Sequence, residues 1–247
     1  MKMKFMLIGL LAVAGLATAQ KVKSQKEGEA VNAVIAAQTP DARIAAVENL
    51  LSKFKDTEFK AAVLEMAANA AQQKNDAAAT MIYGNRALEA NPKSMQALLI
   101  VSSTMAQGTK EFDLDKDEKV KKATKMAGDA IAIINTAEKP NPQLPDEQWI
   151  SIKKDMISRG HETLGMLAAV DKKYDVAIAE FKTAVEAGAT PEPAVMIRLA
   201  VAYTNTKRFD EANATVDRVL AMAGTPEALK KIAQEEKARI AKLKGGQ

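Results

Sequence analysis

The sequence repeats itself with one fixed period, and this feature restricts the fold more than any other. Residues 172–177 (Lys-Lys-Tyr-Asp-Val-Ala) match residues 207–212 (Lys-Arg-Phe-Asp-Glu-Ala), and Thr-Pro-Glu at 190–192 recurs at 225–227; both offsets are 35 residues. Two separate markers therefore agree on one period. A chain of this kind stacks small units in a row instead of folding around one central core.

Each unit is predicted to be a pair of helices. Thr-Pro-Glu is typical of a helix start, because a hydroxyl can cap a free N–H, proline fits the first helical position and a carboxylate faces the positive end of the helix dipole. The polar segment 172–175 interrupts an apolar pattern of helical spacing and so predicts a turn. The pattern consists of Leu164, Leu167, Ala168, Ala177, Phe181, Ala184 and Val185.

These units resemble the tetratricopeptide repeat, a helical hairpin of about 34 residues. The family pattern of the first helix is matched by His161-x₂-Leu164-Gly165 and Met196-x₂-Leu199-Ala200, and that of the second helix by Ala177-x₃-Phe181 and Ala212-x₃-Val216. The resemblance implies an all-α fold, a right-handed superhelical solenoid of helical hairpins. Small residues such as Gly165 are expected where the two helices cross closely.

The resemblance extends towards the N-terminus. A third copy is predicted at 61–94, where residues 87–92 (Ala-Leu-Glu-Ala-Asn-Pro) look like the end of a second helix. Weaker copies are predicted at 26–60, where Thr-Pro-Asp at 39–41 begins a helix, and at 95–135.

A proline-rich stretch departs from the repeat pattern. Pro140, Pro142 and Pro145 exclude a continuous helix. The predicted organisation is therefore N-terminal repeats at 20–135, a linker at 136–145 and C-terminal repeats at 146–247. We expect the solenoid to break or bend at the linker. The last repeat is expected to end in a polar-faced capping helix with Leu229, Ile232, Ile240 and Leu243 on its apolar side.

The first 19 residues read as a secretory signal peptide. Lys2 and Lys4 precede an apolar run at 5–16, and Ala-Thr-Ala at 17–19 is a typical cleavage site. The run is too short to span a bilayer as a helix, and no transmembrane span is expected. We therefore expect an exported protein that is periplasmic or secreted. The chain has no cysteine, so it can form no disulfide.

The sequence gives little support to catalysis, metal binding or nucleic-acid binding. His161 is the single histidine and falls at a helix-packing position. Asp113, Asp115 and Asp117 alternate as in a calcium loop, but Glu118 stands where that loop needs glycine and Thr124 where it needs glutamate. A net charge of +4 on 247 residues is too small to attract nucleic acid. No enzyme activity, cofactor or metal is expected.

The predicted binding surface is the concave face, which in this family is lined by the first helix of each hairpin. The residues placed there are Glu65, Asn69, Arg159, Glu162, Arg198 and Asn205. The family's carboxylate clamp, a lysine and an asparagine four residues apart, has no counterpart at these positions. The expected function is a scaffold that binds a protein or peptide. Two alternatives stay open: an accessory protein of envelope assembly, and a small-ligand or enzymatic site in the insertion 108–146.

Overall fold

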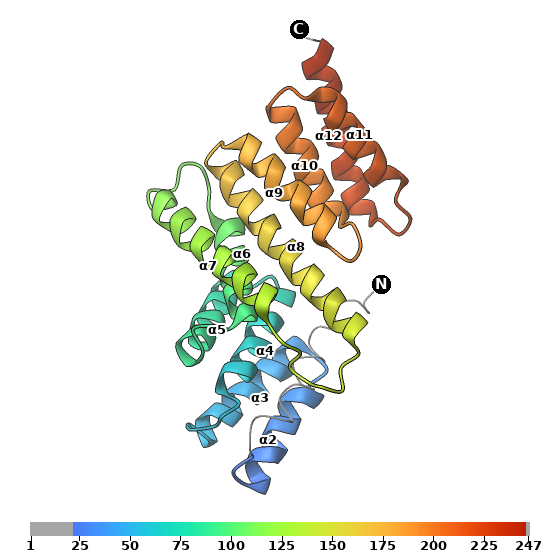
Figure 1. Ribbon diagram of the computed structural model, residues 1–247. Coiled ribbons are helices and arrows are strands. Elements are labelled where there is room, and N and C mark those ends of the chain that lie inside the picture. Colours follow the sequence, from blue (N-terminus) through green and yellow to red (C-terminus); the bar gives the residue numbers. More distant parts are fainter. Residues whose placement is uncertain (1–21, 246–247) are drawn as a thin grey trace.

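The protein is all-α. The computed structural model describes residues 22–245, so the predicted leader at 1–19 lies outside the described residues. The described part contains eleven helices and no strand (Figure 1). They are α2 (Gln25–Ala36), α3 (Pro40–Lys53), α4 (Lys60–Gln73), α5 (Ala77–Ala90), α6 (Met95–Gly108), α7 (Lys116–Thr136), α8 (Asp146–Val170), α9 (Tyr174–Ala187), α10 (Pro193–Asn205), α11 (Phe209–Ala221) and α12 (Glu227–Gly245).

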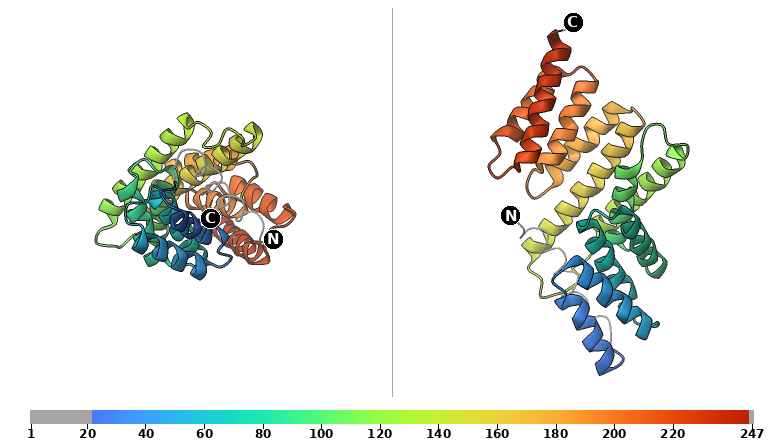
Figure 2. Two further views of the ribbon diagram at one scale, coloured as in Figure 1. Left: turned by 90° about the horizontal axis from the view of Figure 1, so that it is seen from below. Right: turned by 180° about the vertical axis from the view of Figure 1, so that it is seen from behind.

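The helices form five successive hairpins, α2–α3 to α10–α11, followed by α12. Each helix packs on its neighbours along the chain, and the hairpins stack into an elongated solenoid that winds about its long axis (Figure 2). The first helices α4, α6, α8 and α10 also pack on one another, whereas no pair of second helices within residues 22–245 makes a comparable contact. The first helices therefore lie on the inner, concave side.

Three of the hairpins are closed by the same turn. Asn75, Lys172 and Lys207 have φ angles of 58°, 57° and 60°. In each case the N–H of this residue donates to the carbonyl three positions back, and the next N–H donates to the carbonyl five positions back. This is the Schellman arrangement, which satisfies the free carbonyl groups at a helix end. A turn is confirmed next to the predicted position, but it covers 171–173, because α9 already begins at Tyr174.

The predicted helix starts are right to within two residues, but the hydroxyl cap forms at one of three sites. Thr39 Oγ1 accepts from the N–H of Ala42 at 3.2 Å, with Pro40 in the first turn of α3. In contrast, α10 begins two residues after Pro191, at Pro193, and has no side-chain cap. Thr225 donates its hydroxyl to the Met222 carbonyl of the preceding segment instead.

The apolar core runs through the region where the chain was expected to break. Helices α7 and α8 take up much of the insertion 108–146, since they are 21 and 25 residues long whereas α4 and α5 have 14. Leu99 of α6, Ile134 of α7 and Met156 of α8 belong to one buried cluster. The solenoid is thus continuous here, because α8 packs on both α6 and α7. The division of the chain at 136–145 stays a prediction.

Helix α12 covers the end of the stack, as expected of a capping helix, but with a rotated face. It packs on α10 and α11 through Ala233, Glu236 and Ile240, which are buried. The predicted apolar side included Ile232 and Leu243, yet these are 46% and 42% exposed. The expectation is right for Ile240, which is buried, and for Leu229, which packs against the core, and wrong for Ile232 and Leu243.

Candidate groove on the inner face

Glu65 and Asn69 of α4 are linked to α6. Ser94 Oγ donates to Glu65 Oε1 at 2.5 Å, and Gln96 Nε2 donates to Asn69 Oδ1 at 3.5 Å. Burial raises the pKa of Glu65 from 4.5 to about 7, partly offset by the Ser94 hydrogen bond. Both predicted residues therefore contribute to contacts between successive first helices.

Three further predicted residues form similar contacts in the C-terminal half. Arg198 Nη1 lies 2.7 Å from Glu162 Oε1 and joins α10 to α8. Asn205 Oδ1 accepts from Arg239 Nη2 at 2.6 Å and joins α10 to α12. These pairs are separated by 36 and 34 residues, which is about one repeat. The polar residues of the inner face thus form a ladder along the solenoid.

Arg159 is the exception among the six. It is half-buried on α8, three positions before Glu162 and seven before Met166, so the three share one helix face. Its guanidinium has no hydrogen bond or ion pair within residues 22–245. Burial lowers its pKa, and the negative charge of Glu162 opposes this effect. A half-buried cation without a direct partner is suited to binding an anionic or carbonyl oxygen.

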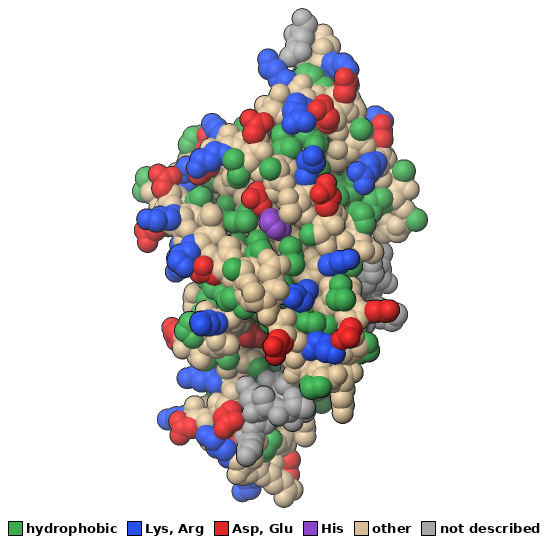
Figure 3. All heavy atoms as spheres, viewed as in Figure 1, with side chains coloured by type: hydrophobic (Ala, Val, Ile, Leu, Met, Phe, Trp, Pro, Cys, Tyr) green, Lys and Arg blue, Asp and Glu red, His purple; other side chains and the backbone are tan. Residues whose placement is uncertain are grey.

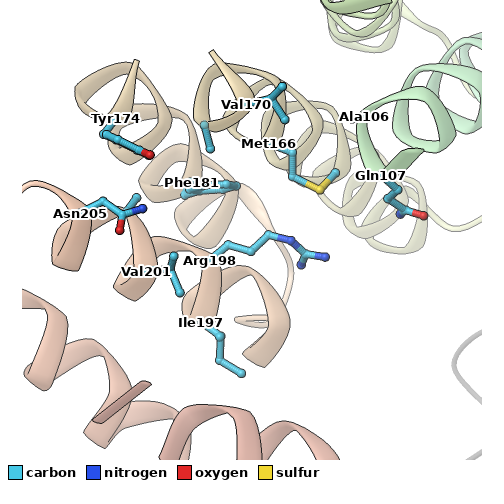
Figure 4. A pocket seen from close by; sticks show the side chains of 12 residues that line it. Ala106, Gln107, Met166, Val170, Tyr174, Phe181, Ile197, Arg198, Val201 and Asn205 are labelled. Atoms are coloured by element: carbon cyan, nitrogen blue, oxygen red, sulfur yellow. The ribbon is translucent and has the colours of Figure 1, made fainter. Parts of the chain in front are cut away.

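A pocket of about 390 Å³ opens beside Arg198 and Asn205 between α6, α8, α9 and α10. Met166, Ile197 and Val201 give it an apolar lining, to which Phe181 of α9 also contributes (Figure 4). The Arg198 side chain reaches from α10 towards the side formed by Met166 and Gln107 (Figure 4). The arrangement can hold an apolar side chain next to hydrogen-bond donors.

The comparison with known proteins agrees with this architecture. A family model described as tetratricopeptide repeat matches residues 171–235, which contain the C-terminal hairpins α9 to α11. Residues 171–235 are therefore tetratricopeptide repeats, within a helical solenoid that runs through the whole described part of the chain. No curated protein matches the sequence.

Several solved structures share the fold of this chain. TTC0263 of Thermus thermophilus, described as a thermophilic TPR protein, has 18% identity and a TM-score of 0.56, with 85% of this chain and 98% of that chain covered. The MamA RS-1 ArsTM double mutant has 12% identity and a TM-score of 0.57, with 81% of this chain and 95% of that chain covered. The pilF protein of Pseudomonas aeruginosa has 14% identity and a TM-score of 0.51, with 96% of this chain and 86% of that chain covered.

Sequence reasoning placed residues on the inner face but missed some of the pocket. Arg198 and Asn205 line the pocket and Glu162 contacts Arg198, whereas Glu65 and Asn69 belong to a separate stretch of the ladder on α4. Gln107 and Tyr174 were missed. Gln107 could have been predicted, because it lies in the last turn of a first helix, the kind of helix that lines the inner face. Tyr174 lies at the start of a second helix, so its position in the repeat does not indicate a place on the inner face.

His161 has a partner of its own on α9. Its Nδ1 lies 2.7 Å from Glu180 Oε2, and both side chains are mostly buried. Figure 3 shows the histidine near the middle of one face, with acidic side chains close to it and basic and acidic groups interspersed around it. This contact joins the two helices of one hairpin and lies apart from the residues that line the pocket.

The carboxylates of the acidic segment after α6 form ion pairs with lysines. Lys119 pairs with Asp113 and Asp115, at 3.5 and 2.8 Å, and Lys116 pairs with Asp117 at 3.0 Å. No group of three or more metal-ligating side chains is found in residues 22–245. Likewise, none of the helices in this range has the length and apolar character that crossing a membrane requires.

Proposed function

We propose that this protein is a non-catalytic scaffold that binds a segment of a partner protein along its inner face. The observation that carries the proposal is the pocket of about 390 Å³ with its apolar lining and Arg198 at its side. Arg159 lies about two helical turns from Met166 on the same face of α8. Pockets of this size and mixed lining bind small groups such as one or two side chains. The tetratricopeptide fold itself favours protein interaction, although fold alone does not establish function.

The chemistry of the groove favours an extended segment with an apolar side chain beside an acidic one. The apolar side chain would lie against Met166 and Val201, and a carboxylate or backbone carbonyl would accept from Arg159. Arg198 already donates to Glu162 through Nη1, which fixes its orientation and leaves its other N–H groups for a ligand. Because these residues are held by packed helices, little conformational entropy is lost on binding.

The proposal is tested with peptides selected from a random displayed library on the purified protein. The variant Arg159→Glu with Arg198→Glu should weaken the selected peptides by about tenfold or more, because both donors become acceptors. Lys182→Glu is the matched control: the side chain is exposed on α9 and does not line the pocket. Circular dichroism checks that all variants keep their helices. A library without binders, or equal weakening by both variants, would contradict the proposal.

We also propose that the protein acts after export. The support is the order of basic, apolar and small residues at 1–19. Mass spectrometry of the protein from cell fractions should find Gln20 at its N-terminus. A protein that retains Met1 would contradict export through this leader.

A further inference from the structure

Arg159 carries hydrogen-bond donors for which the described part of the chain provides no acceptor. The side chain is half-buried, and no hydrogen bond or ion pair reaches it there. The two nearest carboxylates on its side of α8 are engaged elsewhere. Asp155 accepts from the backbone N–H of Ala189 at 3.0 Å, and Glu162 lies 2.7 Å from Arg198. Because withdrawal of a cation from water without a partner costs free energy, an acceptor oxygen from a ligand is favoured at this position.

The two arginines of the inner face offer a ligand different chemistry. Arg198 Nη1 donates to Glu162 at 2.7 Å, so the charge of Arg198 is matched within the protein. The charge of Arg159 is opposed only by the same Glu162, and burial outweighs this effect, because the pKa of Arg159 is lowered. An anion therefore gains more at Arg159 than at Arg198. Since hydrogen bonds to charged acceptors are stronger than those to neutral carbonyls, the group that fits Arg159 best is a carboxylate.

The polar ladder favours an extended ligand over a helical one. An amphipathic helix satisfies its own backbone and needs a continuous apolar groove, but the ion pair Glu162–Arg198 interrupts the apolar surface between Arg159 and Met166. An extended segment instead brings free backbone N–H and C=O groups. Arg198 uses Nη1 for Glu162 and Asn205 uses Oδ1 for Arg239, which leaves N–H groups on both side chains to donate to backbone carbonyls.

The distance along α8 determines how far apart the two contacted side chains lie in the ligand. Arg159 and Met166 are seven positions apart, which corresponds to about 10.5 Å along a helix axis. In a polyproline II segment, side chains about three positions apart lie on the same side and about 9.3 Å from each other. In a β-strand, side chains on one face lie about 7 or 13 Å apart, which fits less well.

We propose that the groove selects an extended segment in which an acidic residue stands three positions from a large apolar residue. The apolar side chain occupies the pocket against Met166 and Val201, and the carboxylate binds the guanidinium of Arg159. Arg198 donates to the backbone between them. This inference rests on the proposed function, because it assigns the sequence that the same groove binds. Arg159 is then the residue that determines the specificity for acidic segments.

The first experiment measures the spacing. Random displayed peptides are selected on the full chain, and pairs of an acidic and a large apolar residue are counted at each separation in the selected and unselected pools. An excess at a separation of three, in either order, is expected. A maximum at seven, which indicates a helical ligand, or binders without acidic residues would overturn the inference while the proposed function stands. A library without binders would contradict both.

The second experiment tests the role of Arg159. It compares one selected peptide with its amide counterpart, in which Gln or Asn replaces the acidic residue. The wild-type chain should bind the acidic peptide about tenfold more tightly. In Arg159→Gln the ratio of the two Kd values should fall to about one, because the charged donor is lost. Val201→Ser in the pocket should weaken both peptides by a similar factor and keep the ratio.

Lys182→Gln is the matched control, because this side chain is exposed on α9, does not line the pocket and should change neither Kd. Circular dichroism confirms that each variant is folded. A ratio that stays unchanged in Arg159→Gln, or that is lost equally in Val201→Ser or Lys182→Gln, would overturn the inference.

Discussion

At Gly165 the space that a Cβ would need is already filled. An ideal Cβ there would lie 2.6 Å from Cδ1 and Cε1 of Phe181, whose ring is 2% exposed and packed between α8 and α9. A shift of the ring would disturb its contacts in the core cluster. Glycine therefore sets how closely the two helices of this hairpin approach.

Gly165→Ala is expected to destabilise the protein by about 1 to 3 kcal/mol, since overpacking outweighs the gain in helix propensity. Gly128→Ala on α7 is the matched control, because no atom lies within 4 Å of its added Cβ. It should be neutral or stabilise by up to about 1 kcal/mol. Urea unfolding measures both. Equal stability of the two variants would show that the Phe181 ring shifts to make room for the added methyl group at little energetic cost.

The raised pKa of Glu65 predicts that the stability of the protein depends on pH. Its pKa is raised from 4.5 to about 7, so the folded state binds the proton more tightly than the unfolded state. The associated stability is complete below pH 4.5 and is lost as pH rises through about 7.

Glu65→Gln should remove this loss while it keeps an acceptor for Ser94. At pH 8 we expect the variant to be more stable than the wild type by about 2 to 3 kcal/mol, and at pH 4.5 the two should be similar. Urea unfolding at several pH values gives the difference. A difference that stays constant between pH 4.5 and 8 would contradict a titration of Glu65.

At the scale of the elements, three hairpin turns place a residue other than glycine in the left-handed region. This conformation costs conformational energy, but it is needed to close the turn. Lys207 has a φ of 60° and is exposed. Lys207→Val should destabilise by about 1 to 2 kcal/mol, because a β-branched side chain is least tolerated in this region. Lys207→Gly should not destabilise. Lys182→Val within α9 is the control and should cost about 0.5 kcal/mol. Thermal unfolding followed by circular dichroism distinguishes the three.

The helices were predictable from sequence because their signals are local. The 35-residue period, the apolar spacing and the prolines each determine structure within a few residues of themselves. The pairs Glu162–Arg198 and Asn205–Arg239 were not predicted, since they depend on how far one first helix is offset against the next. The exposure of Phe112 and Leu114 was also not predicted from sequence. It depends on the path of the segment between α6 and α7, which forms ion pairs with residues of another hairpin.

Across the whole molecule, stability should be graded along the solenoid. Each helix packs on its near neighbours along the chain, so an array of this kind loses structure from its ends and not all at once. The middle helices are covered on both sides, and α6, α7 and α8 share one buried cluster. Within the described residues, α2 and α12 are the outermost helices of the stack.

Native-state hydrogen exchange measures this gradient directly. The amides of α6 and α8 should show the highest free energy of opening, and protection should fall stepwise towards α2 and α12, because local opening at the ends exposes one interface and opening in the middle exposes two. The cluster around Ile134 and Met156 should join the two halves into one protected block. Equal protection in all helices would show a single cooperative unit, and a minimum at 136–145 with two separate maxima would show two independent arrays.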